Sequence, residues 1–244
     1  MSRNSNDLPP SYEDVAEGSS KQVLGQEIFI FAGESVVCET TAGTAPAYKL
    51  SWDVTTIPPK GTSVIFERVD ARLPEKAEGK APAQQQTEHL FYLAHPAGAQ
   101  YGTNTPAYYI TCSTAEQGAT LGNISLETAS KRAPFQRTEF RALLHAGRSA
   151  EGSPLFADKT EPLFEAKPKW VGGRYVWADS HGEEVAHEEE KGRQHRLAVT
   201  APMARGIRDA LVATWCLRLW HDTAESRAAK RDGKLAHYLP ALIL

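Results

Sequence analysis

Cysteine is scarce in this chain, and the placement of the few cysteines excludes several classes of protein. Of the 244 residues 3 are cysteine, and Cys38, Cys112 and Cys216 lie far apart without any CxxC pair. An odd number of widely spaced cysteines forms neither a disulfide framework nor a CxxC zinc site. We therefore expect a protein of a reducing compartment, the cytosol or the nucleus.

Long hydrophobic runs and a strong net charge are also lacking. No segment approaches the roughly 18–20 consecutive apolar residues that cross a bilayer. The start of the chain holds no basic segment followed by an apolar one, so we expect no secretory signal. The net charge of −3 gives no reason to expect a nucleic-acid partner. These absences predict a cytoplasmic protein.

The sequence contains none of the short motifs that mark common active sites. GxSxG, HExxH, the P-loop and GxGxxG are all missing. His181, His187 and His195 do not have the spacing of standard zinc ligands. The neighbouring Glu183 and Glu184 fall on opposite faces of a strand and cannot share a substrate. We expect no enzymatic activity, no metal and no cofactor.

Composition divides the chain into a tail, a domain and an extension. Residues 1–22 are rich in Ser, Asn, Asp, Glu, Pro and Gly, which predicts a disordered tail. Short apolar runs recur through residues 23–225, which predicts one folded domain. Two aperiodic stretches inside it, 71–88 and 145–161, are expected to be loops. Residues 226–244 are expected to form a C-terminal extension.

The domain is predicted to consist mainly of β-strands. In AYKLSWDV (47–54), Tyr48, Leu50, Trp52 and Val54 alternate with polar residues, which is the period of two of a half-buried strand. Twelve candidate strands lie between turn residues: 27–31, 35–39, 47–54, 63–70, 89–94, 107–113, 123–127, 137–145, 162–171, 174–179, 183–190 and 195–201.

One segment, residues 207–220, predicts a helix that is apolar on nearly every side. Its polar residues are Arg208, Asp209, Thr214 and Arg218. A surface helix has one apolar stripe, so a helix apolar all round has to be surrounded by protein or by lipid. At about 1.5 Å per residue the segment is roughly 21 Å long, shorter than the roughly 30 Å hydrocarbon core of a bilayer. Enclosure by protein is therefore the better interpretation.

The strands are the part of the chain that can enclose this helix. A barrel of about eight strands is filled by its own side chains, whereas a larger barrel leaves a lumen. We therefore expect a mainly β fold in which a closed twelve-stranded barrel surrounds a central hydrophobic C-terminal helix. The alternative is a β-sandwich with the helix packed on one face.

The last third of the domain carries a pattern that resembles a known fold family. A hairpin with the spacing D-x-x-G-x-x-[IV]-A is formed by Asp179, Gly182, Val185 and Ala186. An extended strand and the apolar helix follow it. The matching segments there are 177–190, 196–201 and 208–222, and a further match, 45–54, lies near the start of the domain. This arrangement resembles the tubby C-terminal-like fold, which is shared by tubby proteins, phospholipid scramblases and LURP-one-related proteins.

The resemblance covers roughly residues 23–225 and implies a twelve-stranded barrel around a central helix. The chain carries a PPxY motif, residues 9–12, in front of this domain. That order of motif and domain resembles fungal members of the fold family. Tubby domains bind phosphoinositides through basic barrel residues, so the resemblance also implies an anionic membrane lipid as a partner. Lys167, Lys169 and Arg174 lie close together in the sequence and are candidates for such a patch, although a solvated strand face explains them better.

The tail contains a PPxY motif, formed by Pro9, Pro10 and Tyr12. Consecutive prolines favour the polyproline II conformation that WW domains bind, and the tyrosine ring fills a slot beside them. We expect the chain to be a non-enzymatic adaptor that recruits a WW-domain protein. HECT-type ubiquitin ligases are a family that carries WW domains, so we expect the partner to be one of them.

The alternative is a peripheral membrane protein that binds anionic phospholipid through the barrel. The apolar HYLPALIL (237–244) is expected to dock on the domain, or else to contact a partner or a membrane surface. It is too short to span a bilayer.

Overall fold

The computed structural model describes residues 22–41, 43–56, 63–70, 86–96, 105–113, 121–129, 138–145, 156, 160–169, 175–192 and 194–237. Over residues 227–237 it describes the course of a helix. The expected tail up to residue 21, most of both expected loops and residues 238–244 lie outside the described residues.

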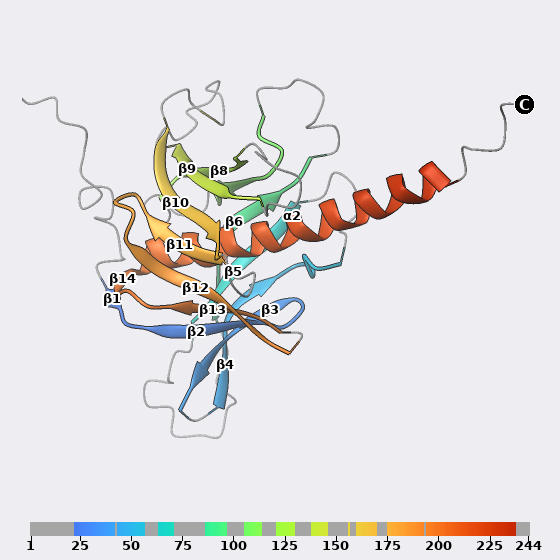
Figure 1. Ribbon diagram of the computed structural model, residues 1–244. Coiled ribbons are helices and arrows are strands. Elements are labelled where there is room, and N and C mark those ends of the chain that lie inside the picture. Colours follow the sequence, from blue (N-terminus) through green and yellow to red (C-terminus); the bar gives the residue numbers. More distant parts are fainter. Residues whose placement is uncertain are drawn as a thin grey trace, which may run out of the picture.

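Twelve antiparallel strands close into a barrel (Figure 1). They are β2 (Glu27–Phe31), β3 (Ser35–Thr40), β4 (Gly43–Leu50), β5 (Ser63–Asp70), β6 (Gln86–Ala94), β7 (Tyr109–Cys112), β8 (Asn123–Thr128), β9 (Phe140–His145), β10 (Glu161–Pro168), β11 (Tyr175–Asp179), β12 (Glu184–Lys191) and β13 (Gln194–Val199). The order around the barrel is β10-β11-β12-β13-β2-β3-β4-β5-β6-β7-β8-β9. Pairing of β9 with β10 closes the ring, so no barrel strand is left with a free edge.

Each of the twelve expected strands overlaps one strand of the barrel. In β4 the burial follows the expected period of two, because Tyr48 and Leu50 are buried and Lys49 between them is exposed. Leu50 of β4 and Phe66 of β5 are paired neighbours whose side chains both point into the buried interior. The closed barrel is therefore confirmed, and the β-sandwich alternative is excluded.

The expected strand 47–54 is too long at its C-terminal end. Strand β4 ends at Leu50, and Trp52 is 40% exposed although Leu50 and Val54 are buried. The Asp53 carboxylate turns the chain here, because its Oδ1 accepts hydrogen bonds from the Thr55 amide and the Thr55 hydroxyl at 2.8 and 2.6 Å. Trp52 therefore does not share the buried face to which the alternation assigned it.

A small second sheet lies at the start of the helix and was not expected from the sequence. Strand β1 (Val23–Leu24) pairs antiparallel with β14 (Met203–Ala204). It joins the first described residues of the chain to the residues just before the helix, segments that are almost the whole domain apart in sequence.

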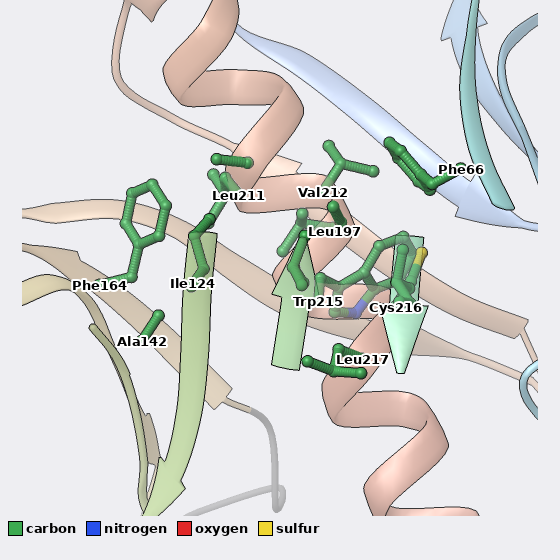
Figure 2. Packing of buried hydrophobic residues seen from close by; sticks show 14 of the residues in the cluster. Phe66, Ile124, Ala142, Phe164, Leu197, Leu211, Val212, Trp215, Cys216 and Leu217 are labelled. Carbon is green, nitrogen blue, oxygen red and sulfur yellow. The ribbon is translucent and has the colours of Figure 1, made fainter. Parts of the chain in front are cut away.

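Helix α2 (Arg205–His237) runs through the barrel, and its first half is enclosed on all sides. Leu211, Trp215 and Cys216 are each 0% exposed. Figure 2 shows them among side chains that come from strands on different sides of the helix, such as Phe66 and Phe164. The expected enclosure of residues 207–220 is therefore confirmed.

The helix is longer than the apolar segment that predicted it. Gly206 does not delay its start, because the helix already begins at Arg205, whose amide donates to the Gln22 carbonyl oxygen. His221 is still buried, Glu225 and Ser226 are exposed, and the helix continues to His237 outside the barrel (Figure 1). No helix in the described part of the chain combines the length and the apolar character needed to cross a membrane.

A charge placed inside the barrel should prevent folding. We expect Leu211→Asp to lower the free energy of unfolding by more than about 4 kcal/mol, because the carboxylate would be buried without a partner. Ser226→Asp is the matched control on the exposed part of the same helix and should change stability by less than about 0.5 kcal/mol. Urea unfolding followed by circular dichroism measures both. A Leu211→Asp protein as stable as the control would contradict the enclosure.

Candidate functional site

Three charged residues in the enclosed part of α2 are almost fully buried. Arg208, Asp209 and Arg218 are 1, 1 and 2% exposed. A buried charge without a partner costs several kcal/mol, so each of these residues needs a partner on the surrounding strands. These partners form the hydrogen bonds and ion pairs at the two ends of the enclosed part of α2.

Asp209 is held by two side chains from neighbouring strands. The Tyr48 hydroxyl on β4 donates to its Oδ1 at 2.8 Å, and Arg68 on β5 donates from Nη1 to its Oδ2 at 2.6 Å. Arg68 also contacts Glu88 on β6. Burial raises the pKa of Asp209 to about 6, against the opposing effects of Arg68 and Tyr48. One helix carboxyl thus links three consecutive strands of the barrel.

Two arginines at the start of α2 hold the chain that arrives from the N-terminal tail. Arg208 donates from Nη1 to the Glu27 carboxylate at 2.6 Å and also bonds the Gly25 carbonyl oxygen. Arg205 bonds the backbone and side chain of Gln22, and its Nη1 lies 3.3 Å from Asp70 Oδ1. We call Gln22–Glu27, with these two arginines, the tail anchor. It places Gln22, the first described residue, at the end of the barrel where α2 begins.

Arg218 marks the other end of the enclosed part of the helix. Its Nη2 lies 2.5 Å from Glu188 Oε2 on β12, and its Nη1 lies 2.6 Å from Asp222 Oδ2. The guanidinium carbon is 4.4 Å from the centre of the Tyr175 ring, a cation–π contact. Trp177 Nε1 donates to Glu188 Oε1 at 3.1 Å. Burial raises the pKa of Glu188, although Arg218 and Trp177 favour its charged form.

The PPxY residues Pro9, Pro10 and Tyr12 lie outside the described residues. Gln22, ten residues after Tyr12, is the first residue of the chain that the structure describes, and it belongs to the tail anchor. The structure therefore fixes the position of Gln22, while the motif itself remains a sequence prediction.

The basic residues considered for an anion patch are partly neutralised. Lys167 Nζ lies 2.5 Å from Glu165 Oε2, and Arg141 Nε lies 3.2 Å from Glu165 Oε1. The hydrogen bond from Lys167 lowers the pKa of Glu165. Lys169 is exposed, and Arg174 lies outside the described residues. A solvated strand face with paired charges describes the observed part of this surface.

No group of three or more His, Cys, Asp and Glu side chains among the described residues could hold a metal ion. His187 Nδ1 lies 3.3 Å from Glu184 Oε1, and its Nε2 lies 3.5 Å from Glu189 Oε1. This imidazole is therefore engaged with carboxylates on its own strand. Cys216 is fully buried in the core, as its place in the apolar helix predicted.

A buried serine–histidine pair joins β8 and β9, and no motif in the sequence predicted it. Ser125 Oγ lies 2.9 Å from His145 Nε2, and both residues are buried. Phe156 covers this place, because its ring centre is 5.0 Å from that of His145. A serine nucleophile needs a base at this distance but also access for a substrate. With Ser125 only 2% exposed, the pair serves as a satisfied polar contact under Phe156.

Removing Arg218 should expose the dependence of the barrel on its buried ion pairs. We expect Arg218→Leu to lower the free energy of unfolding by about 3–5 kcal/mol, because Glu188 would keep a buried charge without its counter-ion. The double variant Arg218→Leu with Glu188→Gln should lose less, because the unpaired charge is gone. Chemical denaturation of the single and double variants measures the difference.

The exposed pair of Lys167 and Glu165 is the control for this experiment. Lys167→Leu should cost less than about 1 kcal/mol, because the lysine side chain is 57% exposed and its ion pair is screened by solvent. Equal losses for Arg218→Leu and Lys167→Leu would contradict the assigned role of Arg218.

The titration of Asp209 should appear in the pH dependence of stability. Its pKa of about 6 in the folded chain lies above the ordinary 3.8, so the folded protein binds the extra proton between these values. The stabilising contribution of this group is fully present below about pH 3.8 and is lost as the pH rises through about 6.

The comparison with Asp209→Asn isolates this contribution, because asparagine does not titrate. The free energy of unfolding of the wild type, minus that of Asp209→Asn, should fall by up to about 3 kcal/mol between pH 4 and pH 6.5. Urea titrations at a series of pH values measure it. A difference that is constant over this range would show that Asp209 has an ordinary pKa.

Comparisons with known proteins do not assign the chain to a family: no family model, no curated protein and no solved structure matches it.

Proposed function

We propose that this chain is a non-enzymatic adaptor whose N-terminal PPxY motif recruits a WW-domain protein. The observation that carries the proposal is the PPxY of Pro9, Pro10 and Tyr12 in a polar tail that the tail anchor fastens to the barrel. The motif supplies the docking chemistry, and the anchor gives a docked partner a defined position.

The filled lumen supports a scaffold rather than a catalyst. The interior that a twelve-stranded barrel would offer to a ligand is occupied by α2, whose side chains there belong to one continuous hydrophobic core. Its buried charges are matched by Tyr48, Arg68, Glu27 and Glu188 of the barrel. The buried interior thus serves stability, and partners have to meet this protein on its outside.

The spacing between the motif and the tail anchor suits recruitment. Ten residues lead from Tyr12 to Gln22, and a flexible chain of this length spans about 17 Å on average. A WW domain bound to the motif would therefore have room beside the barrel while staying close to the start of α2. The WW domains of HECT-type ubiquitin ligases are the partner class that we propose.

The resemblance to the tubby C-terminal-like fold stays a prediction beside this proposal. The twelve-stranded barrel with an enclosed C-terminal helix is the architecture that the resemblance implies. Lipid binding through the barrel has less support, because Lys167 and Arg141 both pair with Glu165.

Calorimetric titration of the full chain with an isolated WW domain tests the proposal. We expect binding by the wild type and at least tenfold weaker binding by Tyr12→Ala, because the tyrosine slot would be empty. Ser11→Ala is the matched control, since this position of PPxY is variable, and it should bind like the wild type. No wild-type binding, or equal binding by Tyr12→Ala, would remove the motif from the function.

A further inference from the structure

The barrel has one seam at which strands far apart in the sequence lie side by side. Among the described strands, eleven of the twelve neighbouring pairs follow each other in the chain and are joined by connections of 2 to 15 residues. Strands β2 and β13 are the exception, because 162 residues separate Phe31 from Gln194. Their ladder pairs Glu27 with Val199, and Figure 1 shows β2 running beside β13. At this place in the described barrel, two neighbouring strands lack a short connection.

The seam continues beyond the barrel to the start of α2. Strand β1 precedes β2 and β14 follows β13, so the pairing of Val23 with Ala204 extends the same antiparallel line with an offset of one residue. Between the two ladders, Gln26 Nε2 donates a hydrogen bond to the Thr200 carbonyl oxygen at 2.8 Å. We therefore define the seam as β1 and β2 on one side and β13 and β14 on the other.

The tail anchor crosses this seam. Arg205 and Arg208 follow β14 in the chain, whereas their acceptors, Gln22 and Gly25, flank β1. Val23 of β1 is 66% exposed, so its side chain adds little apolar burial to the contact. The hold on β1 therefore depends on these hydrogen bonds.

Chain connectivity makes the seam the least costly line along which the barrel can open. Two strands that share a short connection stay close after they separate, so the chain gains little conformational entropy. Strands β2 and β13 have no such connection, and their separation frees both sides of the seam. The loss of the same number of hydrogen bonds is therefore offset by a larger gain of entropy at the seam.

The pair β7–β8 is the main competing line, because its ladder has two register pairs. A connection of 10 residues joins these two strands. Two further hydrogen bonds lengthen their contact. The Leu126 amide donates to the Tyr108 carbonyl oxygen at 2.9 Å, and the Cys112 amide donates to Asn123 Oδ1 at 3.1 Å. The short connection and the longer contact both favour the seam over β7–β8 as the place of opening.

We propose that the barrel opens along the seam and that the tail anchor keeps the seam shut. The Phe31 ring on β2 lies against the Trp215 ring of α2, with ring centres 6.4 Å apart, and Leu197 on β13 packs in the same core. Separation of these strands therefore uncovers the enclosed part of α2. The closed barrel shields the apolar helix, and the open barrel presents it to the surroundings. A protein recruited by the tail would stand beside this line, because Gln22 is part of the tail anchor.

Native-state hydrogen exchange of the full chain, followed by mass spectrometry, measures how often each strand opens. We expect β2 and β13 to open at least about tenfold more often than β5 and β6, because the seam has no short connection. The proposal is overturned if β7 and β8 open more often than the seam. It is also overturned if all strands exchange together at the frequency of global unfolding.

Two variants with the same substitution test the role of the tail anchor. Arg205 lies 3.3 Å from Asp70 at the seam, and Arg141 lies 3.2 Å from Glu165 on β10, away from the seam. We expect Arg205→Gln to raise the opening frequency of β2 and β13 about fivefold to thirtyfold and to leave β5 and β6 unchanged, because the lost hydrogen bonds cross the seam. Arg141→Gln is the matched control and should change both less than about twofold.

Three results with these variants would overturn the role of the tail anchor. In the first, Arg205→Gln leaves exchange at the seam unchanged. In the second, it speeds exchange equally in every strand, which is a general loss of stability rather than release of the seam. In the third, Arg141→Gln opens the seam as much as Arg205→Gln does.

The thiol of Cys216 reports whether opening uncovers α2. Cys216 is 0% exposed in the closed barrel, so iodoacetamide can reach it only after the helix is uncovered. Its rate of alkylation, read by mass spectrometry of the peptide that contains it, should rise in Arg205→Gln by the same factor as exchange at the seam. An unchanged rate would show that the helix stays covered and would overturn this part of the proposal. None of these measurements includes a WW domain, so their failure is distinct from a failure of WW docking.

Discussion

The burial of one helix that is apolar on every side is the constraint on which this structure depends. Leu211, Trp215 and Cys216 cannot all face a single sheet, so the sheet has to close around them. Twelve strands leave the lumen that such a helix fills. The barrel and the helix therefore stabilise each other, and neither has a buried core of its own without the other.

The polar residues of the helix define its position inside the barrel. Asp209 reaches Tyr48 and Arg68 at one end, and Arg218 reaches Glu188 at the other. A hydrophobic lumen alone would tolerate sliding or rotation of the helix, because apolar contacts are not directional. Charged hydrogen bonds at both ends hold one axial position, and this position sets where the tail anchor forms and where α2 leaves the barrel.

Much of the fold could be predicted from the sequence, because the patterns that indicate its strands and its helix involve residues close together in the chain. Alternation identified twelve strands, and the apolar residues of 207–220 identified the helix and its enclosure. The errors occur where a side chain overrides the local pattern. Trp52 continues the alternation of β4, yet Asp53 has already turned the chain. The sequence predicted no partner for Arg208, because Glu27 lies 181 residues away in the chain.

The sequence by itself determined the twelve strands, the enclosed helix and the PPxY motif, because each rests on residues that are neighbours in the chain. The tertiary structure alone decided the partners of the buried charges, the Ser125–His145 contact and the place of the tail anchor at the start of α2. These features join residues that are distant in sequence, and they appear only once closure of the barrel brings their strands together.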